Sequence, residues 1–164
     1  MSSTVAPVRF VSGGRRFRPA IAFKILPANA SNMKANLPGG RERILLVEDD
    51  PDVRMVMRNE LETSGYQIWE AANGLEALKV WKTNASQIDL LLTDIVMPGG
   101  LTGWDLADRL REERPDLKVI LVSGYHPDKT GKKRPESLIL PKPFTLESLT
   151  ETVRNCLDTA SLPR

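Results

Sequence analysis

Four short apolar runs in the chain are each followed at once by charged or hydroxyl-bearing residues. The runs are 44–47, 90–93, 119–122 and 138–140, and they lead into Glu48-Asp49-Asp50, Asp94, Ser123 and Pro141-Lys142-Pro143. Buried parallel strands read as continuous apolar runs, and open parallel sheets bind ligands beyond the carboxyl ends of their strands. If the runs are neighbouring strands, several carboxylates, a hydroxyl and an ammonium meet at one sheet edge. Such a set can hold a divalent metal and a phosphoryl group.

Segments with a helical spacing of apolar residues separate these runs. Each begins with a short polar side chain, which can accept hydrogen bonds from the unpaired N–H groups of a helix start. Pro51 suits the first helix, because the missing N–H of proline costs nothing at the first helical position. The expected caps are Asp50, Asn73, Thr102 and Thr145, and the expected buried positions are Val53, Val56, Met57, Leu61, Leu75, Leu78, Leu106, Ala107, Leu110, Leu146, Leu149, Val153 and Leu157.

A further short strand is expected at 66–70, so that five strands alternate with helices along the chain. This alternation is typical of βαβ units and predicts an α/β fold with a doubly wound parallel sheet. The segment 124–137 is the exception, since it contains two prolines, two glycines and hardly any apolar stripe. It supports only a short or irregular helix.

The net charge is positive before residue 43 or so and negative after it. Residues 1–43 hold eight Lys or Arg and one acidic residue, whereas residues 44–164 hold 15 basic and 20 acidic residues. The prolines and Gly-Gly pairs of the first part argue against a packed unit. We therefore expect a basic, flexible leader over 1–42, a mildly acidic domain over 43–158 and a tail over 159–164. A basic arm can bind nucleic acid or anionic lipid, but a solvated arm is the simpler interpretation.

Several classes of protein are disfavoured by composition. No apolar stretch approaches the roughly 18 residues of a membrane helix, so no membrane span is expected. No secretory signal is recognisable at the start of the chain. The single Cys156 has no internal disulfide partner, which fits a cytoplasmic location, and it is expected on the buried face of the last helix. Nucleotide-binding enzymes are disfavoured because neither a P-loop nor a dinucleotide fingerprint is present.

Four motifs occur in the order, and at roughly the spacings, of one known family. They are Ile-Leu-Leu-Val-Glu-Asp-Asp-Pro at 44–51, Leu-Leu-Thr-Asp-Ile-Val-Met-Pro at 91–98, Val-Ser-Gly-Tyr at 122–125 and Pro-Lys-Pro-Phe at 141–144. By these motifs the chain resembles the receiver domain of bacterial two-component response regulators. The resemblance implies a flavodoxin-like three-layer sandwich whose five strands have the order 2-1-3-4-5.

The resemblance also implies roles for individual residues. Asp94 is expected to accept a phosphoryl group, and the Lys142 ammonium and the Ser123 hydroxyl are expected to contact the oxygens of that group. The bond between Lys142 and Pro143 is expected to be cis. Mg²⁺ is the implied cofactor, because hard oxygen ligands suit it. Its expected ligands are Asp49, Asp94 and the main-chain carbonyl of Val96, with Glu48 acting through water.

Two positions depart from the usual pattern of the family. Ile139 stands where the family usually carries Tyr or Phe, an aromatic ring that swings inward on activation. We expect Ile139 to stay buried, so that switching falls to Tyr125 or the loop after it. Val96, two residues after Asp94, leaves no polar side chain there to guide an attacking water.

The leading hypothesis is a phosphoacceptor domain that receives phosphate from a histidine kinase or a histidine phosphotransfer protein and signals by changing conformation. It is not expected to be an enzyme beyond its own phosphorylation and dephosphorylation. A phosphatase of the haloacid dehalogenase type is an alternative, but it needs Asp at position 96. A degenerate receiver that acts only as an interaction module is a further alternative.

The context of the domain stays open between two possibilities. No DNA-binding domain is recognisable after the motifs, so we expect either a single-domain regulator or the terminal receiver of a hybrid kinase, with an unknown output protein. The stretch 16–27 looks like the end of a histidine-kinase ATPase domain, which favours the second possibility.

Overall fold

The computed structural model describes residues 25–26, 40–124 and 137–159. Most of the segment 124–137, where a short or irregular helix and the loop after Tyr125 were expected, lies outside the described residues, as do most of the leader and tail. The strands are β1 (Ile25–Leu26), β2 (Arg43–Val47), β3 (Gln67–Ala71), β4 (Leu90–Asp94), β5 (Lys118–Ser123), β6 (Ser137–Pro141) and β7 (Phe144–Thr145). The helices are α1 (Pro51–Thr63), α2 (Gly74–Asn84), the 3-10 turn η2 (Ala85–Gln87), α3 (Gly103–Glu113) and α4 (Leu146–Asp158).

Five of the strands form one parallel sheet in the order β3-β2-β4-β5-β6. Counted along the chain from β2, this is the order 2-1-3-4-5, so the predicted doubly wound topology is confirmed. The strands lie within one residue or two of the predicted runs. Because all five run in the same direction, their carboxyl ends meet at one edge of the sheet.

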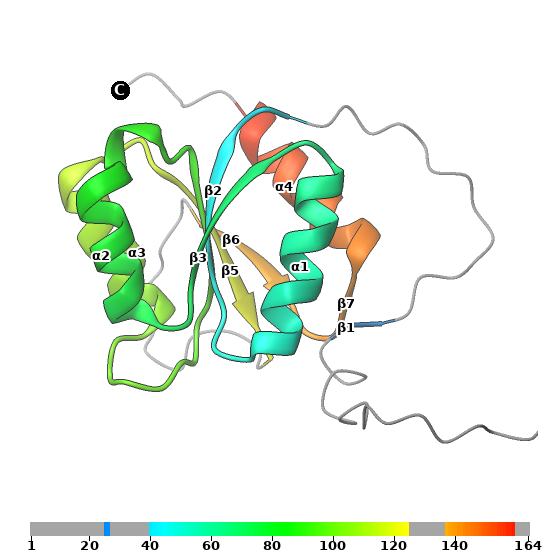
Figure 1. Cartoon of the computed structure of the whole chain (residues 1–164), viewed down its shortest axis with the longest axis horizontal. Helices are drawn as coiled ribbons and strands as arrows, with labels where there is room; N and C mark the ends of the chain where they lie inside the picture. The colour runs from blue at the N-terminus through cyan, green and yellow to red at the C-terminus, as the bar shows by residue number, and fades with distance from the viewer. Residues whose placement is uncertain (1–24, 27–39, 125–136, 160–164) are drawn as a thin grey trace, which may run out of the picture.

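Helices cover both faces of this sheet, with α1 and α4 on one side and α2 and α3 on the other (Figure 1). Alternate strand residues point to opposite faces, because side chains alternate along a strand. Ile44 and Leu46 therefore pack in the core under α1 and α4, while Leu45 and Val47 pack in the core under α2 and α3. Both cores explain why the central strands read as continuous apolar runs.

The four predicted caps open the helices of the structure. The Asp50 side chain accepts from the backbone N–H groups of Asp52 and Val53, with Pro51 at the first helical position. Asn73 accepts from the backbone of Glu76. Thr102 and Thr145 each form a reciprocal capping box with the residue three positions later. These bonds satisfy N–H groups that the helices themselves leave unpaired.

Two predictions of burial are wrong. Leu75 was expected in the core but is 54% exposed, because α2 turns Ala77 and Trp81 toward the sheet instead. Ile139 was expected to stay buried but is 42% exposed. It lies on β6, which is the edge strand of the sheet in the described part of the chain and pairs there with β5 alone. Val56, Leu78, Leu146 and Leu157 are partly buried against the two cores, and Cys156 is buried as predicted.

A short pairing connects part of the predicted leader to the domain. β1 runs parallel to β7, with Ile25 opposite Phe144 and Leu26 opposite Thr145. The two strands lie beside each other at the lower end of α4 in Figure 1. β7 follows directly after Lys142 and Pro143, so this pairing lies next to the carboxyl edge of the sheet. In the described part of the chain, no helix has both the length and the apolar character that crossing a membrane requires.

Candidate functional site

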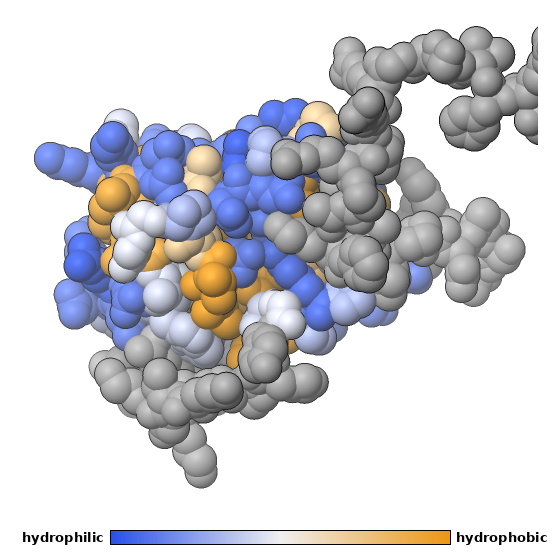
Figure 2. All heavy atoms as spheres, turned by 90° about the horizontal axis from the view of Figure 1, so that it is seen from below, coloured by the Kyte–Doolittle hydropathy of each residue, from blue (hydrophilic) through white to orange (hydrophobic). Residues whose placement is uncertain are grey.

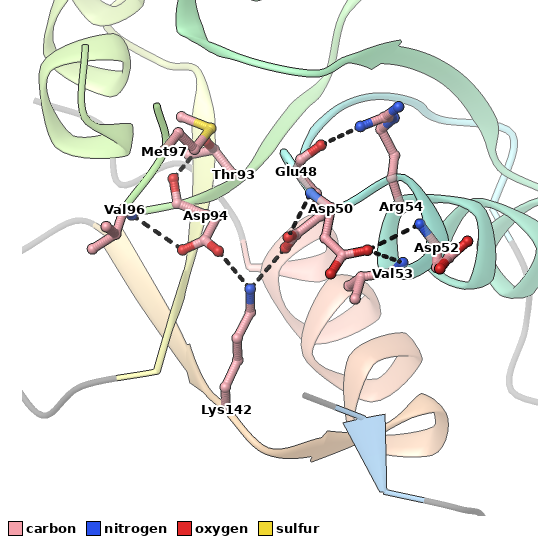
Figure 3. A network of polar contacts seen from close by, with 10 residues as sticks. All are labelled: Glu48, Asp50, Asp52, Val53, Arg54, Thr93, Asp94, Val96, Met97 and Lys142. Atoms are coloured by element: carbon pink, nitrogen blue, oxygen red, sulfur yellow. Dashed lines mark hydrogen bonds and ion pairs between the residues drawn. The ribbon is translucent and has the colours of Figure 1, made fainter. Parts of the chain in front are cut away.

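Three charged side chains from distant parts of the chain meet at the carboxyl edge of the sheet. Lys142 Nζ lies 2.5 Å from Asp94 Oδ2 and 2.7 Å from Glu48 Oε2 (Figure 3). The side chains are nearly enclosed, with exposed fractions of 7% for Lys142, 10% for Asp94 and 1% for Glu48. An ammonium therefore bridges two carboxylates in a setting where water screens their charges weakly.

Lys142 reaches these carboxylates from the segment between β6 and β7. Its backbone N–H donates to the carbonyl of Ser123 at 2.6 Å, and the bond from Lys142 to Pro143 is cis, as the family resemblance implied. Burial by itself lowers the pKa of Lys142, but the charge of Glu48 and the hydrogen bonds to Asp94 and Glu48 outweigh it and raise the pKa. The side chain is therefore a cation at neutral pH.

Asp94 is held at the end of β4 through its backbone and its side chain. Its Oδ1 accepts from the backbone N–H of Val96 at 3.1 Å, and its carbonyl accepts from the Thr93 hydroxyl at 3.0 Å. A Cβ at Gly103 would lie 2.2 Å from the Asp94 carbonyl oxygen, so only glycine fits where α3 approaches this strand. The carboxylate is thus fixed while its Oδ2 faces Lys142.

An acidic cluster surrounds the Lys142 ammonium. Glu48, Asp49 and Asp94 each place one carboxylate oxygen within 4.8 Å of the other two. Both Glu48 oxygens have partners, since Oε1 accepts from the backbone of Asp50 and Oε2 from Lys142. Asp49 is half-exposed, and no described residue forms a hydrogen bond or ion pair with its carboxylate. Hard oxygen atoms with excess negative charge suit a divalent cation such as Mg²⁺, so the residues present fit one.

The structure brings together most of the site residues that the sequence predicts. Glu48, Asp49, Asp94 and Lys142 form one cluster, and the Val96 backbone contacts the Asp94 carboxylate. Ser123 is the last residue of β5 and lies one position beyond Val122, the residue opposite Asp94 on the neighbouring strand. The Val96 side chain is 76% exposed. The roles of these residues stay predictions.

Figure 2 views the molecule from below the orientation of Figure 1, the side toward which β5 and β6 run. Polar and apolar surface lie next to each other on this face. The exposed apolar side chain of Val96, two residues after Asp94, adds apolar surface close to the site. The site therefore adjoins a mixed surface rather than a purely charged one.

Sequence reasoning missed three residues that support the site: Arg54, Thr93 and Gly103. The position of Arg54 in the sequence could have indicated its role. It lies one helical turn after the cap Asp50, and helical side chains tilt toward the N-terminus, so its side chain can reach back to the residues before the helix. In the sequence, Gly103 could be recognised only as part of a helix start. Its close approach to Asp94 depends on how α3 packs, which no local pattern reports.

The conserved sequence profile of the response regulator receiver domain matches residues 44–154 of this chain. The match covers well over half of the chain and includes every residue of the acidic cluster and Lys142. The chain therefore belongs to the family of response regulator receiver domains.

Individual relatives agree with this assignment. The sensor kinase CckA of Brucella abortus (strain 2308) is 39% identical over 128 residues, which make up 76% of this chain but only 13% of that kinase. The response regulator receiver protein CpdR of the same strain is 36% identical over 121 residues, 71% of this chain and 97% of CpdR. The chain thus spans a small part of one relative and nearly all of the other.

Solved structures show the same fold. The crystal structure of the receiver domain from the hybrid histidine kinase CckA matches with a TM-score of 0.62 and 38% identity, and covers 71% of this chain and 99% of that one. The response regulator TrrA from Thermotoga maritima, crystallised in complex with Mg(2+)-BeF, matches with a TM-score of 0.63 and 34% identity over 71% and 99% of the two chains. The expected flavodoxin-like receiver fold is confirmed.

Proposed function

We propose that this domain is the phosphoacceptor of a two-component phosphorelay and that it takes a phosphoryl group from a phosphohistidine onto Asp94. The observation that carries the proposal is the contact of Lys142 Nζ with Asp94 Oδ2 at 2.5 Å, at the carboxyl edge of a parallel sheet. A carboxylate at the end of a strand can act as a nucleophile, and an adjacent ammonium stabilises the charge of a transferred phosphoryl group.

The transfer forms one bond and breaks one. An oxygen of Asp94 attacks the phosphorus, the phosphorus–nitrogen bond of the phosphohistidine breaks, and the imidazole leaves with that electron pair and takes up a proton. Lys142 then pairs with a phosphoryl oxygen, and the Ser123 hydroxyl donates to another. Phosphoryl transfer depends mainly on positioning and on charge stabilisation, which are the features that this site supplies.

The acidic cluster supports a role for Mg²⁺. Asp49, Asp94 and the carbonyl of Val96 would hold the ion, with Glu48 contributing through water. When bound, Mg²⁺ offsets the repulsion between the carboxylates and the incoming phosphoryl group. TrrA, which shares the fold and 34% of its aligned sequence, was crystallised with Mg(2+)-BeF.

The phosphorylated state is expected to be lost slowly by hydrolysis. Val96 is apolar and exposed, so no side chain at this position orients a water molecule toward the phosphorus. We propose that the domain is not an enzyme beyond its own phosphorylation and dephosphorylation. Val96 also argues against a haloacid dehalogenase mechanism, which needs a second Asp there.

The partners follow from the same chemistry. The donor is a histidine kinase or a histidine phosphotransfer protein, and the proposed location is the cytoplasm, where a kinase finds ATP. The similarity to CckA favours a receiver within a hybrid kinase, and the similarity to CpdR favours a separate regulator. The output protein is a partner still to be identified.

Incubation with acetyl phosphate and Mg²⁺ tests the proposal. We expect intact mass spectrometry to show the addition of one phosphoryl group, because Asp94 is the proposed nucleophile of the site. The Asp94→Asn variant and a sample with excess chelator should show no addition. A phosphorylated Asp94→Asn variant, or a modification mapped to Ser123, would contradict the assignment of Asp94 as the phosphoacceptor.

A further inference from the structure

Arg54 contacts the site from α1 without belonging to the family motifs quoted above. Its Nη1 donates to the main-chain carbonyl of Glu48 at 2.5 Å (Figure 3). Its Nε lies 3.5 Å from Glu70 Oε1 on β3. The side chain is 18% exposed, so it is held against the protein rather than extended into solvent. Because the guanidinium is charged, this hydrogen bond is stronger than one between two neutral groups.

This contact occurs where the backbone leaves the sheet. Glu48 is the first residue after β2, and its N–H still bonds to Ala71 at 3.3 Å. The next regular bond is that of α1, from Arg54 N–H to Asp50 carbonyl at 2.9 Å. The turn between these two elements carries Glu48 and Asp49. Arg54 supplies a side-chain hydrogen bond that closes this turn from the helix side.

We propose that Arg54 is a positioning residue, which fixes the turn between β2 and α1 so that the side chains of Glu48 and Asp49 face Asp94. The proposal rests on the proposed function and extends it to a residue of α1. Arg54 does not touch the reacting atoms. It acts through the backbone of Glu48, whose side chain bonds to Lys142.

Substitution of Arg54 distinguishes a positioning role from a purely electrostatic one, because the two roles predict opposite changes in metal affinity. A guanidinium near the acidic cluster repels a divalent cation, so loss of its charge alone would strengthen metal binding. Loss of the contact to Glu48 frees the turn that places Asp49, and metal binding then weakens. The two effects have opposite signs, and positioning predicts the weakening.

Arg58 is a matched control on the same helix. It lies one turn further along α1, carries the same charge, and pairs with the same Glu70, from Nη1 to Oε2 at 2.9 Å. Its other contacts are with Glu62 and Asn59. Arg58→Ala therefore removes a cation and a bond to Glu70 and leaves the carbonyl of Glu48 with its partner.

The experiment is a titration of the full chain with Mn²⁺, in which electron paramagnetic resonance measures the free ion. We expect Arg54→Ala to weaken Mn²⁺ binding by about tenfold, the lower end of the effect of residues that orient metal ligands. Arg58→Ala should change it by less than about twofold. Arg54→Lys keeps a donor of the same charge and should recover part of the Mn²⁺ affinity. It replaces Arg54→Ala as the test variant if Arg54→Ala fails to fold.

Unchanged or tighter Mn²⁺ binding by both Arg54 variants would overturn the proposal, and so would an equal loss in Arg58→Ala. Because this titration does not depend on phosphorylation, it stands apart from the test of the proposed function. That function fails if the unaltered chain gains no phosphoryl group on Asp94, whatever the Mn²⁺ titrations show.

Discussion

Glu48 and Asp49 are neighbours in the chain but have different surroundings. Glu48 is buried, and both of its carboxylate oxygens accept hydrogen bonds, from Lys142 and from the backbone of Asp50. Asp49 is half-exposed, and its carboxylate has no partner among the described residues. Asp49 is therefore the member of the pair that can turn an oxygen toward a cation without breaking a bond.

This difference predicts unequal effects of substitution on metal binding. Asp49→Ala should weaken Mg²⁺ binding by at least about tenfold, because it removes the residue proposed as a direct ligand. Glu48→Gln should weaken it less, because Gln still accepts from Lys142. Isothermal titration calorimetry with Mg²⁺ measures both affinities. Equal losses would show that Glu48 also binds the ion directly.

At the level of elements, α2 and α3 cover the same face of the sheet but bury their leucines differently. Leu106 of α3 is fully buried, whereas Leu75 in the first turn of α2 is 54% exposed. Trp81 of α2 faces the sheet, and its Nε1 donates to Glu113 of α3 at 2.8 Å. The contact between the two helices thus orients α2 and leaves Leu75 outside.

Matched leucine substitutions test this orientation. Leu106→Ala should lower the free energy of unfolding by about 2–5 kcal/mol, because it leaves a cavity in the core. Leu75→Ala should change it by less than about 0.5 kcal/mol, because the side chain is already in contact with water. Urea denaturation followed by circular dichroism measures both values. A loss in Leu75→Ala as large as that in Leu106→Ala would mean that α2 is rotated from the orientation described.

For the whole molecule, the pairing of β1 with β7 raises the question of whether the leader stabilises the domain. The pairing involves two residues of each strand, and among the described residues β7 is the one strand that pairs with β1. A two-stranded pair of this length is marginal in water by itself. The domain boundary predicted at residue 43 is therefore still the expected edge of the independently stable part.

Deletion of residues 1–40 is expected to leave the melting temperature within about 3 °C of that of the full chain, because the strand pairing described for the leader comprises two residue pairs. Amide hydrogen exchange at Phe144 and Thr145 should become faster, since their strand partner is gone. Differential scanning calorimetry and exchange mass spectrometry provide the two measurements. A larger fall in melting temperature would show that the leader packs on the domain beyond β1.

The sequence alone was sufficient for features that depend on neighbouring residues. The apolar runs predicted the strands of the main sheet, and Asp50 and Thr102 predicted helix starts, because burial on two faces and helix capping leave local patterns. The order of the motifs predicted which residues lie at strand ends. It therefore placed Glu48, Asp94 and Lys142 at one sheet edge before any distance was known.

Only the tertiary structure decided which faces are covered and which side chains touch. Leu75 and Ile139 are apolar in the sequence, but periodicity does not report the rotation of a helix or the lack of a neighbour beside an edge strand. The bridge from Lys142 to Glu48 joins residues 94 positions apart. Such contacts arise when separate elements pack together, so they depend on the whole arrangement and leave no local signal in the chain.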